Sequence, residues 1–254
     1  MAWLDALPLA VIAPAMLAAL LAAAAAGYCG HRWLIKRRGA TDPESHDHLL
    51  TAILGLLALL LGFTFSLALN RYETRRELVV QEANALGTTW LRAQLLEPSN
   101  KAALSGLLRD YLDVRLAWSE AGSAPDMAAR TAVLQQKLWA ATGQAVRSDP
   151  SPQLSRALMD AMNESFDLAS ARAATRVAHV PDRVLDVLLL YALLSAAMLG
   201  YASAAKGKPQ RIATSAVMVL LTLAMVMILD IDRPRSGAIE VSQQPLADLK
   251  QSWR

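Results

Sequence analysis

In the first third of this chain, an apolar segment continues into a charged one without interruption. Residues 49–69 carry no charge, and Asn70-Arg-Tyr-Glu-Thr-Arg-Arg76 follow directly. Neither Gly nor Pro stands at the junction, so nothing there breaks a helix. We therefore predict one helix that starts at Leu49, crosses a bilayer and projects into water as a rigid extension.

Charged residues are nearly absent from four windows of the sequence. A spanning helix needs about 20 apolar residues, and the windows that meet or approach this length are Ala6–Tyr28, Leu49–Leu69, Val184–Ala204 and Ile212–Leu229. Asp186 lies at the polar edge of the third window. The first window is too long for a signal peptide and follows no basic residues, so we expect it to be retained. It is rich in Ala, which favours close helix–helix packing over a plain anchor.

The segment from Asn70 to Asp182 has helical periodicity throughout. Apolar residues recur at helical spacing in several stripes, namely Val79, Ala83, Leu86, Trp90 and Ala93, then Leu104, Leu107, Leu108, Tyr111 and Leu112, then Leu134 and Leu138, then Leu154, Leu158, Met162, Phe166 and Ala169. Breaks at 98–100, 122–125 and 143–152 divide the segment into four helices. We interpret the stripes as the ordinary core of a helical bundle, and not as a ligand site.

The predicted fold class is an all-α integral membrane protein with four transmembrane helices and an extramembrane helical bundle. Its expected parts are residues 1–69 with two spans and a basic linker, 70–182 as the helical domain, 183–229 with two further spans, and 230–254 as an extended tail. Pro234 prevents the last helix from continuing. We expect an extended segment against the bundle, followed by a short amphipathic turn.

The chain contains few signs of catalysis or of metal binding. Its net charge of +3 is too small to indicate nucleic acid, and its single cysteine, Cys29, excludes an internal disulfide. No phosphate-binding loop, dinucleotide fingerprint or zinc-protease motif is present. His46-Asp47-His48 is interpreted as a solvated linker in preference to a metal site. Glu73, Arg75, Arg76 and Glu77 are interpreted as a solvated face and not an ion site. We expect no enzyme, cofactor or metal.

Three stretches of the chain resemble one family. They are Gly62-Phe63 through Arg71-Tyr72 to Asn84, then Asn163-Glu164 with the Arg-rich helix end that follows, and Asp232-Arg233-Pro234-Arg235-Ser236-Gly237 with Val241-Ser-Gln-Gln-Pro245. The tail motif is the most specific of the three. The stretches cover most of the chain from Leu50 onward and resemble the bestrophin-like family of bacterial membrane proteins, a domain of unknown function.

A looser resemblance reaches the bestrophins, which are pentameric anion channels. Their second span has a Gly-Phe pair and, eight residues beyond the Phe, an Arg followed by an aromatic residue; Phe63, Arg71 and Tyr72 match this spacing. In the same register the apolar neck of the family falls on Gly55, Leu59 and Phe63, which share one helix face. The alternative is that Leu59 and Phe63 face lipid or pack between helices. Gly55 replaces a bulky residue of the family, and Asp230 and Asp232 are too few for its calcium site.

The resemblance implies a homo-oligomer, most simply a pentamer, of the bacterial inner membrane that conducts inorganic ions, with anions favoured. Ser66 and Asn70 would form a polar exit beyond the neck. The alternative is a non-conducting sensor or scaffold that uses the helical domain for protein interaction. The expected partners are further copies of the chain, the bilayer and ions, without nucleic acid.

Two further expectations concern topology and the tail. Lys and Arg in the short loops after the first and third spans predict that those loops are cytoplasmic and that the helical domain and the tail are periplasmic. The bestrophin resemblance implies the opposite, a cytosolic helical domain, and our prediction follows the charge rule. The tail motif is expected to be structural. We predict that Arg233 and Arg235 bind a carboxylate such as Glu73, Glu77 or Glu164, and that Pro234 keeps the chain extended.

Overall fold

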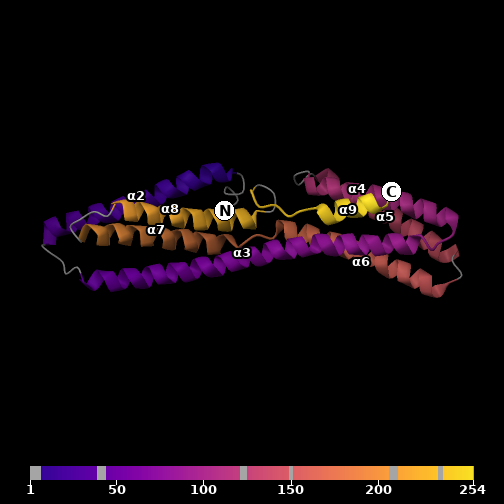
Figure 1. The fold of residues 1–254 in the computed structure, drawn as a ribbon, viewed down its shortest axis with the longest axis horizontal. Coiled ribbons are helices and arrows are strands. Elements are labelled where there is room, and N and C mark those ends of the chain that lie inside the picture. The colour runs from indigo at the N-terminus through magenta and orange to yellow at the C-terminus, as the bar shows by residue number, and fades with distance from the viewer. Residues whose placement is uncertain are drawn as a thin grey trace. The chain divides into compact units, whose positions relative to one another are not determined.

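The structure is a computed structural model that describes residues 7–38, 44–120, 125–148, 151–205, 211–233 and 237–253. These residues form eight helices and no strand (Figure 1). The helices are α2 (Leu9–Arg38), α3 (Glu44–Ala93), α4 (Pro98–Glu120), α5 (Pro125–Ser148), α6 (Pro152–Val177), α7 (Asp182–Ala205), α8 (Arg211–Asp232) and α9 (Gln244–Ser252). The predicted all-α fold class is confirmed.

The chain divides into two compact units. The membrane unit comprises Met1–Tyr72 and His179–Glu240, and the bundle unit comprises Glu73–Ala178 and Val241–Arg254. Helix α3 belongs to both, because its 50 residues include the boundary at Tyr72 and Glu73. The uninterrupted helix that the sequence predicted across this junction is therefore present.

Four helices in the described part of the chain are long and apolar enough to cross a membrane. They contain the four predicted windows, with small differences at the ends: α2 begins after Pro8, and α8 continues past Leu229 to Asp232. Their apolar side chains meet in one core, which includes Leu20, Leu57, Ala68, Leu188, Ala192, Ala196, Met218 and Ile228. The chain is thus a multi-pass membrane protein.

Helices α2 and α7 approach each other closely at two glycines. A Cβ on Gly27 would lie 1.8 Å from the carbonyl oxygen of Ala197, and one on Gly200 would lie 1.9 Å from that of Ala24. Only hydrogen fits at these two positions, so the backbones touch directly. Close packing by small residues is how helices associate in lipid, and the prediction for the Ala-rich first span is confirmed.

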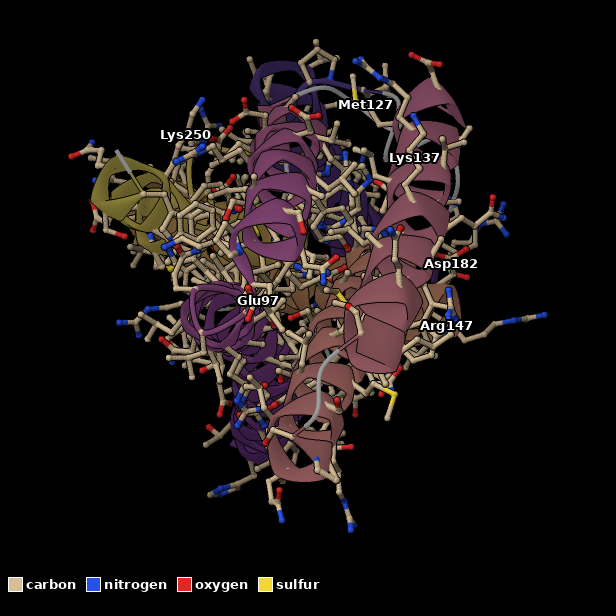
Figure 2. All side chains as sticks on the ribbon, turned by 90° about the vertical axis from the view of Figure 1, so that its right-hand side faces the viewer. Glu97, Met127, Lys137, Arg147, Asp182 and Lys250 are labelled. Atoms are coloured by element: carbon tan, nitrogen blue, oxygen red, sulfur yellow. The ribbon has the colours of Figure 1, made fainter. Side chains whose placement is uncertain are left out.

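The bundle unit has its own core, built from the predicted stripes. Val79, Leu86, Leu104, Leu108, Tyr111, Leu112, Leu138, Leu158 and Met162 are all buried in it. Charged side chains such as Lys137 and Arg147 on α5 and Lys250 on α9 point away from this core (Figure 2). The four helices predicted from periodicity between the second and third spans are therefore present as the second part of α3, α4, α5 and α6.

The chain end differs from the prediction, because a nine-residue helix, α9, replaces the expected short turn. Leu246 is fully buried, and the ring of Trp253 stacks on that of Trp90 at 4.4 Å. Arg109 lies over Trp90 and donates from Nη2 to the carbonyl oxygen of Trp253 at 3.0 Å. These contacts with residues distant in sequence stabilise the short helix, which its own residues did not predict.

Candidate functional site

The residues predicted to form a pore neck lie on an exposed face of α3. In the single chain Leu59 is 53% exposed and Phe63 is 68% exposed. Gly55 is exposed too, and an added Cβ there would meet nothing within 4 Å. Ser66 and Asn70, the predicted polar exit, are also exposed. The structure thus brings all five positions to one side of α3.

The opposite side of α3 faces the membrane core. Leu57, Thr64 and Ala68 are 3%, 2% and 0% exposed. Each residue advances about 100° around a helix, so the five candidate positions occupy roughly 80° centred opposite these three. Thr64 Oγ1 donates to the Leu60 carbonyl oxygen at 2.8 Å, which satisfies its hydroxyl within the helix. The packing of one face therefore turns the other toward lipid, a neighbouring copy or a pore.

The acidic residues of the tail motif make contacts inside the membrane unit. Both carboxylate oxygens of Asp232 accept the Val180 N–H at 3.0 Å, and His179 Nδ1 lies 3.5 Å from Oδ2. Asp230 Oδ1 accepts the Ala238 N–H at 2.7 Å. A Cβ on Gly237 would lie 2.0 Å from that oxygen, so the turn requires glycine. Both carboxylates therefore accept hydrogen bonds from backbone N–H groups.

The basic and aromatic residues of the same motif are placed as follows. Arg233 is 3% exposed, and its Nη1 donates to the Leu7 carbonyl oxygen at 2.9 Å. Tyr72 packs partly buried against the membrane core. The Nε atom of Arg71 is buried and has no hydrogen-bond partner within the described ranges. Pro234 and Arg235 lie outside the described residues.

The carboxylates predicted to bind these tail arginines have other described contacts or are exposed. Glu73 pairs with Arg76 at 3.2 Å, and Glu77 accepts a hydrogen bond from Gln81 Nε2 at 2.9 Å. Glu164 is exposed on α6. The contact described for the Arg233 guanidinium is with the backbone of the membrane unit.

Of the three residues of the possible metal motif, 46–48, only His48 has a described side chain. No group of three potential metal ligands occurs in the described part of the chain.

A buried charge network in the bundle unit was missed by the sequence analysis. Glu82 on α3 is fully buried and accepts hydrogen bonds from Arg115 Nε at 2.5 Å and from Arg172 Nη1. Arg172 Nη2 also donates to Gln243 Oε1 at 2.8 Å. Burial lowers the pKa of Arg172 from its ordinary value, and the charge of Glu82 opposes that change. One carboxylate thus ties α3, α4 and α6 together.

An aromatic ring and a further arginine extend this network. The Trp118 ring lies 4.6 Å from the Arg115 guanidinium and 4.3 Å from that of Arg176. Arg75 on α3 donates to the carbonyl oxygens of Thr175 at 3.2 Å and Ala178 at 2.7 Å, where α6 ends. A guanidinium at a helix C-terminus satisfies carbonyls that lack helical partners. The network therefore fixes α3 in the bundle.

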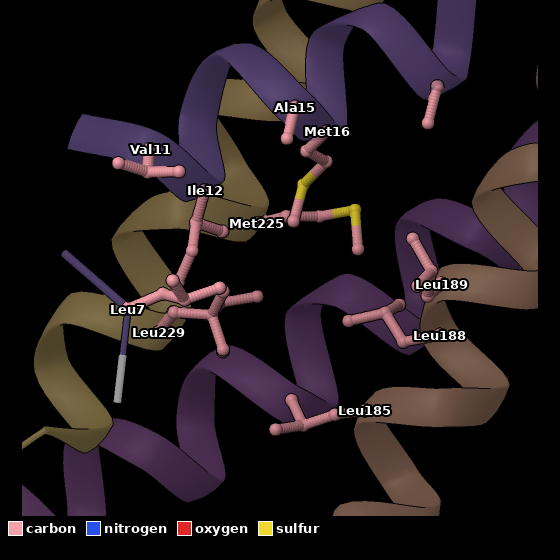
Figure 3. Close-up of a pocket in the computed structure, with 12 residues that line it drawn as sticks. Leu7, Val11, Ile12, Ala15, Met16, Leu185, Leu188, Leu189, Met225 and Leu229 are labelled. Atoms are coloured by element: carbon pink, nitrogen blue, oxygen red, sulfur yellow. The ribbon is translucent and has the colours of Figure 1, made fainter. Parts of the chain in front are cut away.

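An apolar recess of about 200 Å³ opens between α2, α7 and α8 in the membrane unit (Figure 3). Its lining is entirely apolar and consists of Leu7, Val11, Ile12, Ala15, Met16, Ala19, Leu185, Leu188, Leu189, Met225, Ile228 and Leu229. Without a polar side chain, such a recess suits hydrocarbon and cannot replace the hydration shell of an ion.

Comparisons with known proteins agree with this architecture. The profile of the Bestrophin-like domain matches residues 17–246. A mutated bacterial bestrophin homologue from Klebsiella pneumoniae has a similar fold, with a TM-score of 0.72 and 12% identity over 94% of this chain and 96% of that chain. A second mutant of it has a TM-score of 0.71 and 12% identity over 95% and 97% of the two chains. At such identity the likeness concerns the fold alone. No curated protein matches the sequence.

Proposed function

Because this chain belongs to the bestrophin-like family of membrane proteins, we propose that it is an oligomeric ion channel whose pore is lined by α3. The bacterial inner membrane is its proposed location, and a homopentamer its proposed assembly. A protomer with four spanning helices encloses no substantial pathway by itself, whereas cyclic symmetry places the same face of each copy around one axis.

The observation that carries this proposal is the exposed face of α3. Phe63 and Leu59 would form two apolar rings, and Ser66 with Asn70 would form the polar exit. A narrow apolar segment excludes water, and an ion cannot cross it without losing hydration. Gly55 leaves the third ring without side chains, so the constriction would depend on two rings. In this arrangement Phe63, the larger side chain, is the main barrier.

The proposal also states which ions pass, namely anions in preference to cations. The resemblance to bestrophins favours anions, and the apolar rings themselves carry no charge. The first charged residues that follow Asn70 along α3 are Arg71, Glu73, Arg75, Arg76 and Glu77. Glu73, Arg76 and Glu77 are exposed, and Glu73 pairs with Arg76. In a KCl gradient across a planar bilayer we expect the current to reverse near the chloride equilibrium potential. Reversal near the potassium potential would refute anion selectivity and leave the pore itself intact.

The neck assignment is tested by three substitutions, of which two should raise the conductance and one should lower it. Phe63→Ala should widen and wet the constriction and raise the unitary conductance; Leu59→Ala should do so more weakly. Gly55→Leu should complete the third ring and lower the conductance, and the open space around Gly55 allows the larger side chain in the protomer. Phe65→Ala is the matched control, because Phe65 lies on another face of α3.

Assembly is measured on the same proteins, by the mass of the particle extracted in mild detergent. A single pentameric mass for wild type and variants is expected. If wild type, Phe63→Ala and Phe65→Ala are equally silent in bilayers that conduct with a control channel, the channel proposal fails. A non-conducting scaffold that acts through the bundle unit then becomes the better account.

A further inference from the structure

A second recess, of about 330 Å³, lies in the membrane unit near the end of α7 and the start of α8. Its polar lining combines one guanidinium with several hydroxyl groups, from Arg211, Thr214 and Ser215 on α8, Ser203 on α7 and Tyr28 on α2. No carboxylate is among the described residues that line it. Arg211 is the one charged side chain among them, which distinguishes this recess from the apolar one in Figure 3.

The rest of the lining is apolar and lies deeper in the span. Leu21 and Ala25 come one to two turns before Tyr28 on α2, toward the middle of the helix. The recess is thus polar at the end of the helices and apolar toward their centre. A ligand that fits both parts must itself have an anionic group joined to hydrocarbon.

The shape of the recess is fixed by the packing of two helices. Ala24 and Gly200 both line it, and the backbones of α2 and α7 touch between them. The positive end of the α8 dipole also lies at this site, because α8 begins at Arg211. A preformed wall reduces the ordering cost of binding.

We propose that this recess binds the phosphate headgroup of an anionic phospholipid, with the first part of an acyl chain along Leu21 and Ala25. Arg211 is the central residue, since the guanidinium fork matches phosphate oxygens geometrically. The hydroxyls of Ser203, Thr214 and Ser215 supply further donors. Basic pockets between membrane helices are known to suit anionic headgroups. The proposal is independent of whether the protein conducts ions.

The chain contains its own reporter for this site. Cys29 lines the recess, is exposed, and is the single cysteine of the sequence. The experiment measures the rate at which N-ethylmaleimide modifies Cys29 in the purified full-length protein, in a neutral detergent, as lipid is added. Phosphatidylglycerol should slow the modification in a saturable way. Phosphatidylcholine, and inorganic phosphate at the same concentrations, should leave the rate unchanged.

Three variants assign the effect to the recess. Arg211→Gln should raise the phosphatidylglycerol concentration for half-maximal protection about fivefold, the value of one guanidinium near an anionic lipid. Arg211→Lys should keep part of the affinity, because the charge remains. Arg183→Gln, which removes an exposed arginine at the opposite end of α7, should bind like wild type.

Four results would overturn the proposal. Equal protection by phosphatidylcholine would indicate detergent displacement without headgroup recognition. Protection that survives Arg211→Gln would place the lipid elsewhere. Protection by inorganic phosphate would identify a site for free anions and not for lipid. Modification of Cys29 at one rate at every phosphatidylglycerol concentration would show that this lipid does not enter the recess.

Discussion

Neutralising Glu82 should destabilise the bundle unit more than any change to an exposed carboxylate. The side chains of Glu82, Arg115 and Arg172 are 0%, 2% and 5% exposed, so water cannot screen them. Glu82→Gln keeps the shape but leaves two buried guanidinium charges without the carboxylate between them. Removing one partner of a buried ion pair costs about 3–5 kcal/mol. In a unit of about 120 residues this lowers the melting temperature by roughly 10 to 20 °C.

The measurement is thermal unfolding of the full-length protein in detergent, combined with hydrogen exchange followed on peptides from α4 and α6. Faster exchange in both helices is expected, because Glu82 connects them to α3. The control is Glu73→Gln, which breaks an exposed pair with Arg76 and should change stability by less than about 1 kcal/mol. If the two variants melt within a few degrees of each other, the free energy assigned to the buried network is wrong.

Two further predictions concern the membrane unit and the pH dependence of the bundle. Gly27→Ala places a Cβ 1.8 Å from the Ala197 carbonyl oxygen and should reduce the yield of folded protein. Gly30→Ala is the control and should express like wild type, because an added Cβ there meets nothing within 4 Å. Size-exclusion profiles in detergent compare the yields of the two variants with that of wild type. Burial raises the pKa of Tyr111 to about 12, so the stability it contributes is present below its unfolded pKa, about 10, and is lost as the pH rises to 12. Unfolding at pH 8 and pH 12 should show wild type losing roughly 2 to 3 kcal/mol more than Tyr111→Phe over this interval, and an equal loss in both would contradict the assignment.

Helices α2 to α8 of this protein could be predicted because their signals are local. A bilayer demands about 20 consecutive apolar residues from each span, and such runs stand out whatever the helix contacts. The stripes from Val79 to Ala169 follow helical spacing because one face of each helix enters a core. The sequence likewise predicted that the fourth span ends before Pro234, and α8 ends at Asp232.

The buried network was missed because its members are distant in sequence. Glu82 lies 33 residues from Arg115 and 90 from Arg172. Glu82 and Glu77 are the same residue type on the same helix, and only packing buries one of them. A signal did exist, since Glu82 lies three residues after Val79 and four before Leu86, on an apolar face. A charged residue on such a face predicts that it pairs with an opposite charge in the core, but the pattern does not identify which residue that is.

For the predicted neck residues, too, one part of the assignment follows from the sequence and another part only from the tertiary structure. Gly55, Leu59 and Phe63 could be assigned to one helix face from their spacing alone, because helical geometry fixes the angle between them. The spacing could not determine whether that face was packed inside the protomer. The tertiary structure decided this by burying Leu57, Thr64 and Ala68 on the other side, since a helix in a small bundle has only as many buried faces as it has neighbours.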